Sequence, residues 1–459
     1  MRTDKPPLTS ADLLTGGRSP GVLLPTATPD PFAGYLAWRK FRYVAAEAGL
    51  GVMEAWAIEK QRRLMTRQAL GVLRWEGGEF CLNMTAQMHE TLRIVDRASG
   101  VDPIDGFAEQ PTAGVLRKRL RVMFSDGQLT ERRRIAGAMD EAAESSIMEG
   151  AATTRRDAIE LLRSGRPPRN VSERMVVNNY LAMQEVKRLL GKPLSFKMLV
   201  ELQSLLTAGS LESSDEVGRL RLDSDCVRVA DSRSGETEFT PPPAEALVPL
   251  LRSICAFANA EHVGDRFIHP LVKACVLHFL IGYAHPFCDG NGRTARAVFY
   301  WYALRHGYGI FEFLTISELI RQGYSRYPQA YLDCELDDGD VTYFVLYKLD
   351  VIQRALQRLE HHIQREEERI ASSDRFLKFA KDLNLRQRLL LEHALRKPLT
   401  VYTVKSHMNS NGITPVTARA DLDDLVRRKF MVTSKRGKEV LYMLAPGFAQ
   451  KLASKLAKG

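Results

Sequence analysis

The sequence predicts a mainly α-helical protein with one small β-hairpin in its middle part and a mixed helical and stranded region near its C-terminal end. Two observations carry this prediction. Apolar residues recur at spacings of three and four over most of the chain, which is typical of amphipathic helices. Alternation of polar and apolar residues, which is typical of strands, is confined to a few short segments. A chain of 459 residues is also too long for one small core, so we expect several domains.

Composition narrows the class of protein. The chain is 45% hydrophobic, which is ordinary for a globular protein. Its six cysteines show neither a disulfide framework nor a zinc-ligand spacing, and no stretch is long and apolar enough to span a membrane. We therefore expect a cytoplasmic protein with no membrane partner. The net charge of +10 is compatible with a polyanionic partner, but it is more often the mark of an ordinary basic protein.

The elements follow from these spacings in chain order. Residues 1–30 contain Pro, Gly, Ser and Thr without an apolar stretch, and they predict a flexible leader that is not a signal peptide. Loops are expected at Gly77–Gly78 and at residues 103–111. Helices are predicted at 53–73, 84–98, from 131 onward, and at 171–190, 196–206, 244–259, 268–283 and 293–306.

One β-like segment interrupts the helices. Residues 225–231 alternate between polar and apolar side chains, and residues 232–235 are a cluster of turn formers. Residues 237–240 can return as a second strand before three consecutive prolines stiffen the exit. The pattern predicts a short hairpin.

Residues 285–296, His-Pro-Phe-Cys-Asp-Gly-Asn-Gly-Arg-Thr-Ala-Arg, combine groups that suit a nucleoside triphosphate. Gly290 and Gly292 allow backbone N–H groups to approach phosphate oxygens, because no Cβ stands in the way. A helix that starts near Asn291 would add the partial positive charge and the N–H donors of its N-terminus. The backbone of this stretch therefore suits an anion.

Four side chains of the same stretch suit the chemistry. His285 is a candidate general base for an attacking hydroxyl. Asp289 is a hard oxygen ligand suited to Mg²⁺, which also keeps water and substrate phosphates as ligands. Arg293 and Arg296, spaced three apart on a helix, share a face and can grip successive phosphates.

The stretch matches the signature of the Fic family, His-Pro-Phe-x-Asp/Glu-Gly-Asn-Gly/Lys-Arg-x-x-Arg. The resemblance implies a Fic-type helical bundle that transfers AMP from ATP, with Mg²⁺, to a Ser, Thr or Tyr hydroxyl of a protein, its own chain included. The alternative is a loop between two core helices with no functional role. That alternative is the better explanation of any one of these residues alone, but not of all of them together in this order. The nucleotide-binding residues implied are Asp289, Gly290, Asn291, Gly292, Arg293, Thr294, Ala295 and Arg296.

Two further segments resemble parts of Fic proteins. The hairpin resembles the Fic flap, which holds a target segment by strand addition; this would put Val227, Arg228, Val229 and Ala230 over the nucleotide pocket. A surface hairpin with no functional role is the alternative.

Residues 145–150, Ser-Ser-Ile-Met-Glu-Gly, resemble the inhibitory motif of Fic proteins that carry their own inhibitor helix. On a helix, Ser145 and Glu149 would face the same way. Glu149 would then form a bidentate pair with Arg296 and deny that arginine to the γ-phosphate. The alternative is an ordinary helix end.

Downstream of the motif the resemblance is less complete. Family members commonly carry adjacent tyrosines before a Gly-Asp element, but here Pro328 separates Tyr327 from the next tyrosine, Tyr331. Structural aromatic residues are an equally good account of both tyrosines, so no adenine contact is assigned. Residues 349–363 predict a long helix that packs with a neighbour or with a second subunit, as in a homodimer.

The C-terminal region has its own order of elements. Helices are predicted at 385–395, 402–409 and 414–428, and strands at 430–433 and 440–443. This order resembles a winged helix-turn-helix, which would offer Thr417, Arg419 and Arg427 of its third helix, and Lys435 and Arg436 of its wing, to duplex DNA. A role in protein contact only is the alternative.

The predicted division and function follow from these resemblances. Three functions remain open: an autoinhibited protein adenylyltransferase, a hydrolase that removes AMP in the same pocket with Glu149 aligning water, and a DNA-binding regulator with a vestigial Fic domain. The predicted parts are a leader (1–30), an N-terminal helical region (31–140), an inhibitory helix and entry to the core (141–190), a Fic catalytic domain (191–352), a linker helix (353–383) and a winged helix-turn-helix (384–448).

Overall fold

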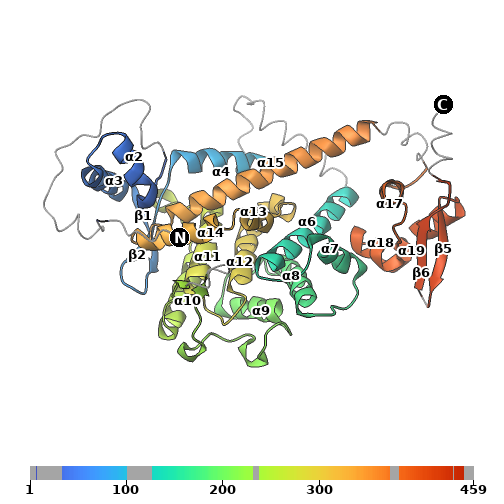
Figure 1. Ribbon diagram of the computed structural model, residues 1–459, viewed down its shortest axis with the longest axis horizontal. Helices are drawn as coiled ribbons and strands as arrows, with labels where there is room; N and C mark the ends of the chain where they lie inside the picture. Colours follow the sequence, from blue (N-terminus) through green and yellow to red (C-terminus); the bar gives the residue numbers. More distant parts are fainter. Residues whose placement is uncertain are drawn as a thin grey trace. The chain divides into compact units, whose positions relative to one another are not determined.

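The computed structural model describes residue 7 and residues 34–100, 127–230, 237–372, 382–437 and 439–448. Within these residues the protein is mainly α-helical, as predicted, and its strands form two-stranded antiparallel sheets, β1 with β2, β3 with β4, and β5 with β6 (Figure 1). The leader apart from residue 7, the loop expected at 103–111 and the turn expected at 232–235 lie outside the described residues. No helix among the described residues combines the length and apolar character needed to cross a membrane.

The chain forms two compact units that alternate along the sequence. Unit 1 consists of residues 1–103, 181–311 and 316–354, and unit 2 of residues 104–180, 312–315 and 355–459. The main elements of unit 1 are α2 (Trp38–Glu47), α3 (Val52–Thr66), β1 (Arg67–Leu73), β2 (Glu79–Asn83), α4 (Ala86–Ser99), α9 (Phe196–Thr207), β3 (Val229–Ala230), β4 (Thr237–Phe239), α10 (Ala244–Asn259), α11 (Pro270–Ala284), α12 (Asn291–Arg305), α13 (Ile316–Gln322) and α14 (Arg326–Leu336). Those of unit 2 are α6 (Gly127–Met148), α7 (Arg155–Ser164), α17 (Leu385–Arg396), α18 (Val404–Asn411), α19 (Pro415–Arg427), β5 (Met431–Arg436) and β6 (Glu439–Leu444), while α8 (Val171–Arg188) and α15 (Thr342–Ser372) run through both units.

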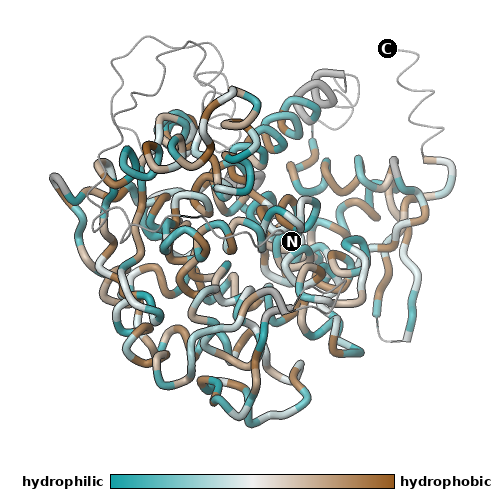
Figure 2. The backbone as a smooth tube through the Cα atoms, turned by 60° about the vertical axis from the view of Figure 1, so that its left-hand side comes forward, coloured by the Kyte–Doolittle hydropathy of each residue, from teal (hydrophilic) through white to brown (hydrophobic). Residues whose placement is uncertain are grey.

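The centre of unit 1 is the pair of helices α11 and α12, which pack side by side (Figure 1). Thirteen of the fifteen residues of α11 are buried, as expected of a helix that is apolar on all sides. Most other helices instead alternate hydrophobic and hydrophilic stretches along their length, the pattern of one buried and one exposed face (Figure 2). The loop between α11 and α12 is thereby held between two well-packed helices.

The helix predicted at 53–73 is wrong in its last third. Helix α3 ends at Thr66, and residues 67–73 form strand β1, paired antiparallel with β2. Leu70 and Val72 are buried while Gly71 and Leu73 are exposed, which is the two-residue alternation of a strand. The partner that decides this is β2, which is itself held by a distant segment, because Cys81 in β2 donates its N–H to the carbonyl of Gly339 at 3.1 Å.

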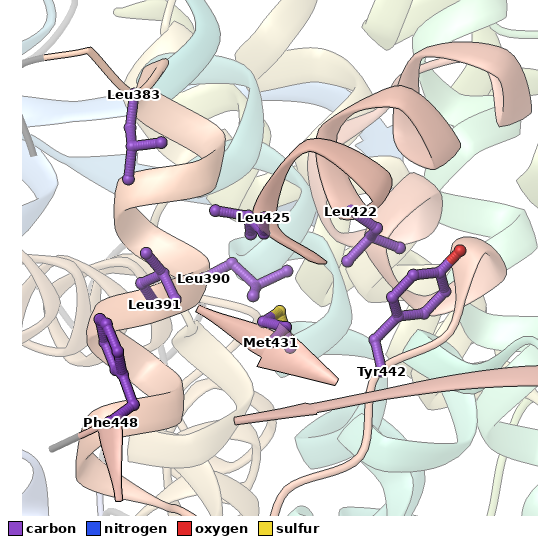
Figure 3. Packing of buried hydrophobic residues seen from close by; sticks show 8 residues of the cluster. All are labelled: Leu383, Leu390, Leu391, Leu422, Leu425, Met431, Tyr442 and Phe448. Atoms are coloured by element: carbon purple, nitrogen blue, oxygen red, sulfur yellow. The ribbon is translucent and has the colours of Figure 1, made fainter. Parts of the chain in front are cut away.

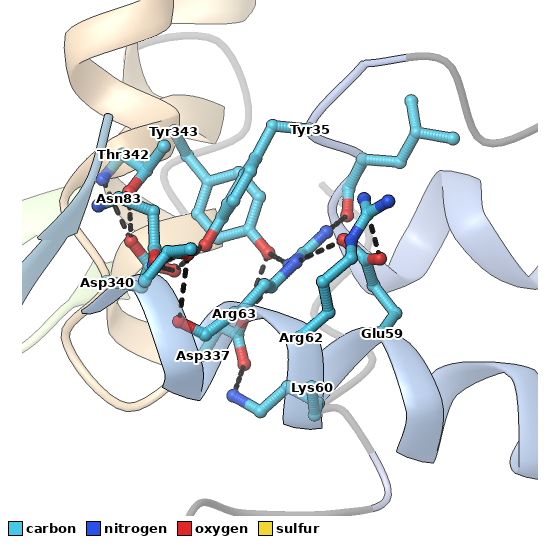
Figure 4. Close-up of polar contacts among 12 residues, drawn as sticks. Tyr35, Glu59, Lys60, Arg62, Arg63, Asn83, Asp337, Asp340, Thr342 and Tyr343 are labelled. Carbon is cyan, nitrogen blue, oxygen red and sulfur yellow. Dashed lines mark hydrogen bonds and ion pairs between the residues drawn. The ribbon is translucent and has the colours of Figure 1, made fainter. Parts of the chain in front are cut away.

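A buried polar network joins the N-terminal helices to the start of α15 within unit 1 (Figure 4). Lys60 donates to Asp337 at 2.6 Å, and the Arg63 guanidinium donates to the hydroxyl of Tyr343 at 2.6 Å. Tyr35 donates in turn to Asp340, whose pKa is raised by its burial. Buried charges are tolerated only when they are paired and hydrogen-bonded. The segment that contains Tyr35, α2 and α3 is therefore an integral part of unit 1.

In unit 2, the C-terminal elements appear in the predicted order. Three helices are followed by the β5–β6 hairpin, and Tyr402 forms an additional bridge to Tyr442 in β6. A hydrophobic cluster fills the space between α17, α19 and the hairpin (Figure 3). Its buried members are Leu383, Leu390, Leu391, Leu422, Leu425, Met431, Tyr442 and Phe448.

Candidate active site

His285 stands at the point where α11 ends. Its backbone has φ 45° and ψ 57°, the left-handed conformation, and its N–H donates to the carbonyl of Ile281 at 3.0 Å. Its Nδ1 lies 3.3 Å from the carbonyl oxygen of Gly282. A proton on Nδ1 would satisfy that carbonyl and leave the lone pair on Nε2, which is the tautomer a general base requires. The next residue, Pro286, contributes to the end of α11, because proline disfavours a right-handed helical conformation in the residue before it.

The loop after His285 is shaped by Gly290 and Asn291. Gly290 has φ 81°, and a Cβ at this position would lie 2.8 Å from Cγ2 of Thr207. The Asn291 side chain accepts from the N–H of Phe287 at 2.9 Å and donates to the carbonyl of the same residue at 2.8 Å. The loop is thus closed by a single side chain, and only glycine fits at its turn.

Helix α12 begins at Asn291, as predicted. Its first intrahelical hydrogen bond runs from the N–H of Thr294 to the carbonyl of Gly290 at 2.8 Å. The N–H groups of residues 291–293 consequently have no partner inside the helix, and the positive end of the helix dipole lies beside His285 in the chain. This is an arrangement suited to phosphate.

Asp289 is the carboxylate of the loop. Its Oδ1 accepts from the N–H of Gly290 at 2.6 Å and its Oδ2 from Arg293 at 2.8 Å, while about half of its side chain, 49%, stays exposed. An ionised carboxylate has about four lone-pair sites, so both oxygens can accept more. Among the residues that the structure describes, no group of three or more His, Cys, Asp or Glu is placed to hold a metal ion. The donor set fits a Mg²⁺ ion that takes most of its ligands from nucleotide and water.

The two arginines of the motif are both buried. Arg293 is 1% exposed and also donates to the carbonyl of Leu206 in α9 at 3.1 Å. Its guanidinium therefore braces the loop against α9, so that its predicted grip on phosphate would require it to leave these partners. Arg296, 3% exposed, lies one turn further along α12. Between them Thr294 and Ala295 are fully buried.

The hairpin predicted as a flap is shorter than expected. Its first strand, β3, covers only Val229–Ala230, and Asp225 lies in a short 3-10 helix (Asp223–Asp225) instead of a strand. The reason is that the Asp225 carboxylate accepts from Arg219 at 2.7 Å and from the N–H of Leu222 at 2.7 Å, which fixes a turn. Val227 is half-buried and Arg228 exposed, both ahead of the strand.

The second strand of the hairpin connects it to the site. The ring of Phe239 in β4 lies 5.8 Å from that of Tyr283, two residues before His285. The Tyr283 hydroxyl donates to Glu76, in the turn between β1 and β2, at 2.6 Å. The flap hairpin therefore packs beside the end of α11, while its position over a nucleotide stays a prediction.

Two further residues of the site were not found by sequence reasoning. Gln203, fully buried in α9, donates to the carbonyl of Asp289 at 3.1 Å and accepts from the N–H of Gly218 at 2.7 Å. Arg221 is also buried, and its guanidinium donates to the carbonyl of His285 at 2.6 Å. Burial lowers the pKa of this guanidinium. The available signal in the sequence was Gly218 followed three residues later by Arg221, just ahead of the flap.

The tyrosines of α14 belong to the core. The Tyr327 hydroxyl is 2.9 Å from Nε2 of the buried His278, and the Tyr331 ring stacks on Phe279 at 5.1 Å. A Cβ at Gly282 would lie 2.2 Å from the Tyr331 hydroxyl, so this glycine permits the close approach of α14 to α11. Structural aromatic residues are the better account of both tyrosines.

The segment with the inhibitory resemblance lies in unit 2. Helix α6 ends at Met148, so Glu149 stands just beyond the helix, with its N–H bonded to the carbonyl of Ser146 at 3.2 Å. Gly150, at φ 94°, completes the helix end. Ser145 is buried and Glu149 half-buried. The expectation that both lie on one helix is therefore wrong for Glu149, because the Gly150 cap ends the helix one residue earlier.

The four basic residues predicted to contact DNA are on the surface. Arg419, Arg427, Lys435 and Arg436 are all exposed, and Thr417 is half-buried. Arg427 is paired with Asp424 at 2.9 Å, one turn earlier on α19.

Helices α11 and α12, with the loop that turns at Gly290 between them, place His285 beside the N-terminus of α12. A family model, Fic/DOC family, matches residues 193–303, which include α9 to α12 and the whole loop. This part of the chain is a Fic/DOC domain.

Relatives match a quarter of the chain. Proteins named Protein adenylyltransferase Fic from Drosophila erecta and Culex quinquefasciatus are 28% and 31% identical over 116 residues, 25% of this chain. The matched part spans about a fifth, 21%, of the length of these relatives.

Two Fic proteins are among the solved structures that match this chain. A Fic family protein from Desulfovibrio desulfuricans G20 is 17% identical, with a TM-score of 0.48, and the match covers 79% of this chain and 97% of that one. Fic-1 (residues 134–508) from C. elegans is 20% identical, with a TM-score of 0.40, over 61% of this chain and 84% of that one.

Proposed function

We propose that this protein transfers AMP from ATP to a hydroxyl side chain of a protein, its own chain included. The observation that carries the proposal is the 285–296 loop, where an imidazole with a carbonyl partner on Nδ1 precedes the N-terminus of α12. Two relatives that match 25% of the chain are named Protein adenylyltransferase Fic, which supports the same reaction.

The proposed reaction assigns a task to each group. The target hydroxyl oxygen forms a bond to the α-phosphorus, the bond from that phosphorus to the bridging oxygen breaks, and pyrophosphate leaves. Nε2 of His285 takes the proton of the attacking hydroxyl. The N–H groups at the start of α12 hold phosphate oxygens, and Arg296 orients the γ-phosphate.

Asp289 would hold the Mg²⁺ that accompanies ATP. The ion would neutralise phosphate charge, while Gly290 and Arg293 keep the carboxylate oriented through the two hydrogen bonds it already accepts.

We further propose that Glu149 restrains this activity. The motif 145–150 ends in a turn that is capped by Gly150, and the Glu149 carboxylate in this turn is half-buried. This segment can present the carboxylate to an arginine elsewhere in the protein. Pairing with Arg296 would leave ATP bound in an unproductive pose.

Incubation with ATP labelled on its α-phosphate and Mg²⁺ tests the proposal. Label on protein supports transfer, and its absence in both the parent protein and Glu149→Gly would overturn it. A hydrolase would instead release AMP from a pre-modified protein, in a reaction that loses rate when Glu149 is replaced.

A second proposed activity is binding of duplex DNA by residues 384–448. This part has twelve Lys and Arg against five Asp and Glu, so it holds most of the chain's excess positive charge. Arg419 on α19, and Lys435 and Arg436 at the end of β5, are exposed. A helix and a hairpin tip with exposed cations suit a DNA groove and its flanking phosphates.

We expect affinity for a fluorescent mixed-sequence duplex to fall steeply between low and physiological salt. Each phosphate contact contributes about 0.9 to the slope of log affinity against log salt, so alanine at Arg419, Arg427, Lys435 and Arg436 should reduce the slope by about 3 to 4. Fluorescence anisotropy measures this, and AMP transfer in the same variant should stay at the parent rate. An affinity that does not depend on salt would favour a role in protein contact.

A further inference from the structure

Arg221 contacts the backbone on both sides of the catalytic histidine. Its Nε donates to the carbonyl of His285 at 2.6 Å, and its Nη2 lies 3.4 Å from the carbonyl of Ala284. Its own N–H donates to the carbonyl of Pro286 at 2.9 Å. One residue thereby binds three consecutive carbonyl groups.

These three carbonyls flank a strained residue. A residue other than glycine in the left-handed region is held there only when its surroundings fix it, and His285 has φ 45°. The guanidinium also donates to the carbonyl of Pro242, which follows β4 of the flap hairpin. Arg221 therefore connects the backbone of His285 to the exit of the flap.

We propose that Arg221 is a positioning residue, which sets the direction of the His285 imidazole and fixes the flap exit relative to it. This rests on the proposed AMP transfer. A misplacement of about 1 Å at a reacting group can lower a rate about 100-fold, whereas binding of ATP depends on other atoms. Loss of Arg221 should therefore act on kcat.

The test uses Arg221→Met and Arg221→Lys in a Glu149→Gly background. We expect Arg221→Met to lower kcat about 10- to 100-fold with KM for ATP changed less than threefold, and Arg221→Lys to recover part of the rate. Arg219→Met is the matched control, because that guanidinium bonds to Asp215, Leu220 and Asp225 and to none of the three carbonyls. Circular dichroism and thermal melting report the folded fraction.

Hydrogen exchange of the amides at 285–292, measured by mass spectrometry, gives a readout that does not need activity. Faster exchange in Arg221→Met than in Arg219→Met supports the positioning role. A rate loss that only follows the folded fraction, or equal exchange in the two variants, would overturn it. A Glu149→Gly protein without any transfer would instead refute the proposed function, with the exchange result still decisive for Arg221.

A second inference comes from unit 2, where helix α18 of the C-terminal elements packs on α6 and α7. Lys405 donates to the carbonyl of Gly165 at 2.5 Å, and Asn409 to that of Arg163 at 3.2 Å, so α18 satisfies the carbonyl end of α7. At the end of α18, a Cβ on Gly412 would lie 3.1 Å from Cδ1 of Ile135 in α6.

Helix α6 is the helix that leads into Glu149. Its end is also held from within unit 2, since the Ser146 hydroxyl accepts from Asn179 at 3.3 Å and lies 3.2 Å from the carbonyl oxygen of Met175. The side of α6 nearer its start is covered by the turn after α18. A change in how α18 docks would therefore alter the support of the whole helix.

From this packing we infer that α18 docking stabilises the inhibitory placement of α6, and that the C-terminal elements thereby regulate AMP transfer. The inference rests on the proposed inhibition by Glu149. A carboxylate in place of Lys405 would face the negative end of α7, and removal of the Asn409 amide would deprive a second carbonyl of its donor.

The experiment compares Lys405→Glu/Asn409→Ala with the parent protein, each with and without Glu149→Gly. We expect transfer to rise about 3- to 10-fold in the parent background and to stay unchanged in the Glu149→Gly background, because the two changes then act on the same equilibrium. Lys397→Glu, at an exposed lysine after α17, is the charge-matched control.

Hydrogen exchange is measured at the amides of Gly150 and Ala151, which bond to carbonyls near the end of α6. It tests the coupling between α18 and α6 separately from the proposed AMP transfer. Faster exchange in the docking variant supports the coupling even if no variant transfers AMP, which would refute only the proposed function. Unchanged exchange, or a rise in AMP transfer that persists with Glu149→Gly, would overturn the inferred coupling between α18 docking and α6.

Discussion

Replacement of His285 by alanine is expected to abolish AMP transfer while ATP still binds. Transfer requires removal of a proton from the attacking hydroxyl, and loss of a positioned general base lowers rates by about 10²- to 10⁴-fold. The phosphate contacts proposed for ATP come from other groups, chiefly the N–H donors at the start of α12. Binding and chemistry should therefore separate in this variant.

The measurement is incorporation of labelled AMP in a Glu149→Gly background, with ATP affinity followed by calorimetry. Asp289→Ala is a useful comparison, because we expect it to raise the Mg²⁺ concentration needed for transfer. Transfer at the parent rate in His285→Ala would remove the imidazole from the mechanism.

Glu149→Gly is expected to raise AMP transfer, self-modification included, above the rate of the parent protein. The physical reason is competition for one guanidinium. Arg296 can pair with a carboxylate or with the γ-phosphate of ATP, and its planar fork serves only one of them at a time. An inhibited state favoured by about 3 kcal/mol would leave less than one protein in a hundred competent, so its release gives a gain of about 100-fold.

Glycine is also a suitable replacement at position 149 on structural grounds. Glu149 lies beyond the end of α6, next to the Gly150 cap, so its replacement does not interrupt a helical turn. Glu149→Gln serves as the control, since it keeps the size of the side chain and removes its charge. It should give most of the gain if charge pairing is the cause.

The double variant Glu149→Gly/Arg296→Ala should lose the gain, because no arginine remains to orient the γ-phosphate. Equal or lower transfer in Glu149→Gly would show residues 145–150 to be an ordinary helix end, or Glu149 to serve hydrolysis.

The sequence by itself determined the helical character of the chain and the residues of the 285–296 loop. Helical periodicity is a local property, so α4, α10 and α12 could be placed to within about two residues of their observed ends. The loop could be identified because its chemistry is contiguous: Gly290 and Asn291 act within a few residues of His285. The geometry of this loop is therefore determined largely by residues that are neighbours in the sequence.

Only the tertiary structure decided which distant groups hold that loop. Arg221 and Gln203 reach it from segments more than sixty residues away, and β1 is a strand because β2 offers it backbone partners, while β2 is in turn bonded through Cys81 to Gly339. Arg293, which its spacing predicts to bind phosphate, is buried and donates to the carbonyl of Leu206 in α9, a contact that its spacing did not indicate. Periodicity and motif spacing report which residues share a face. They do not report which distant carbonyl, amide or side chain will lie opposite that face, because that depends on packing between segments far apart in the chain.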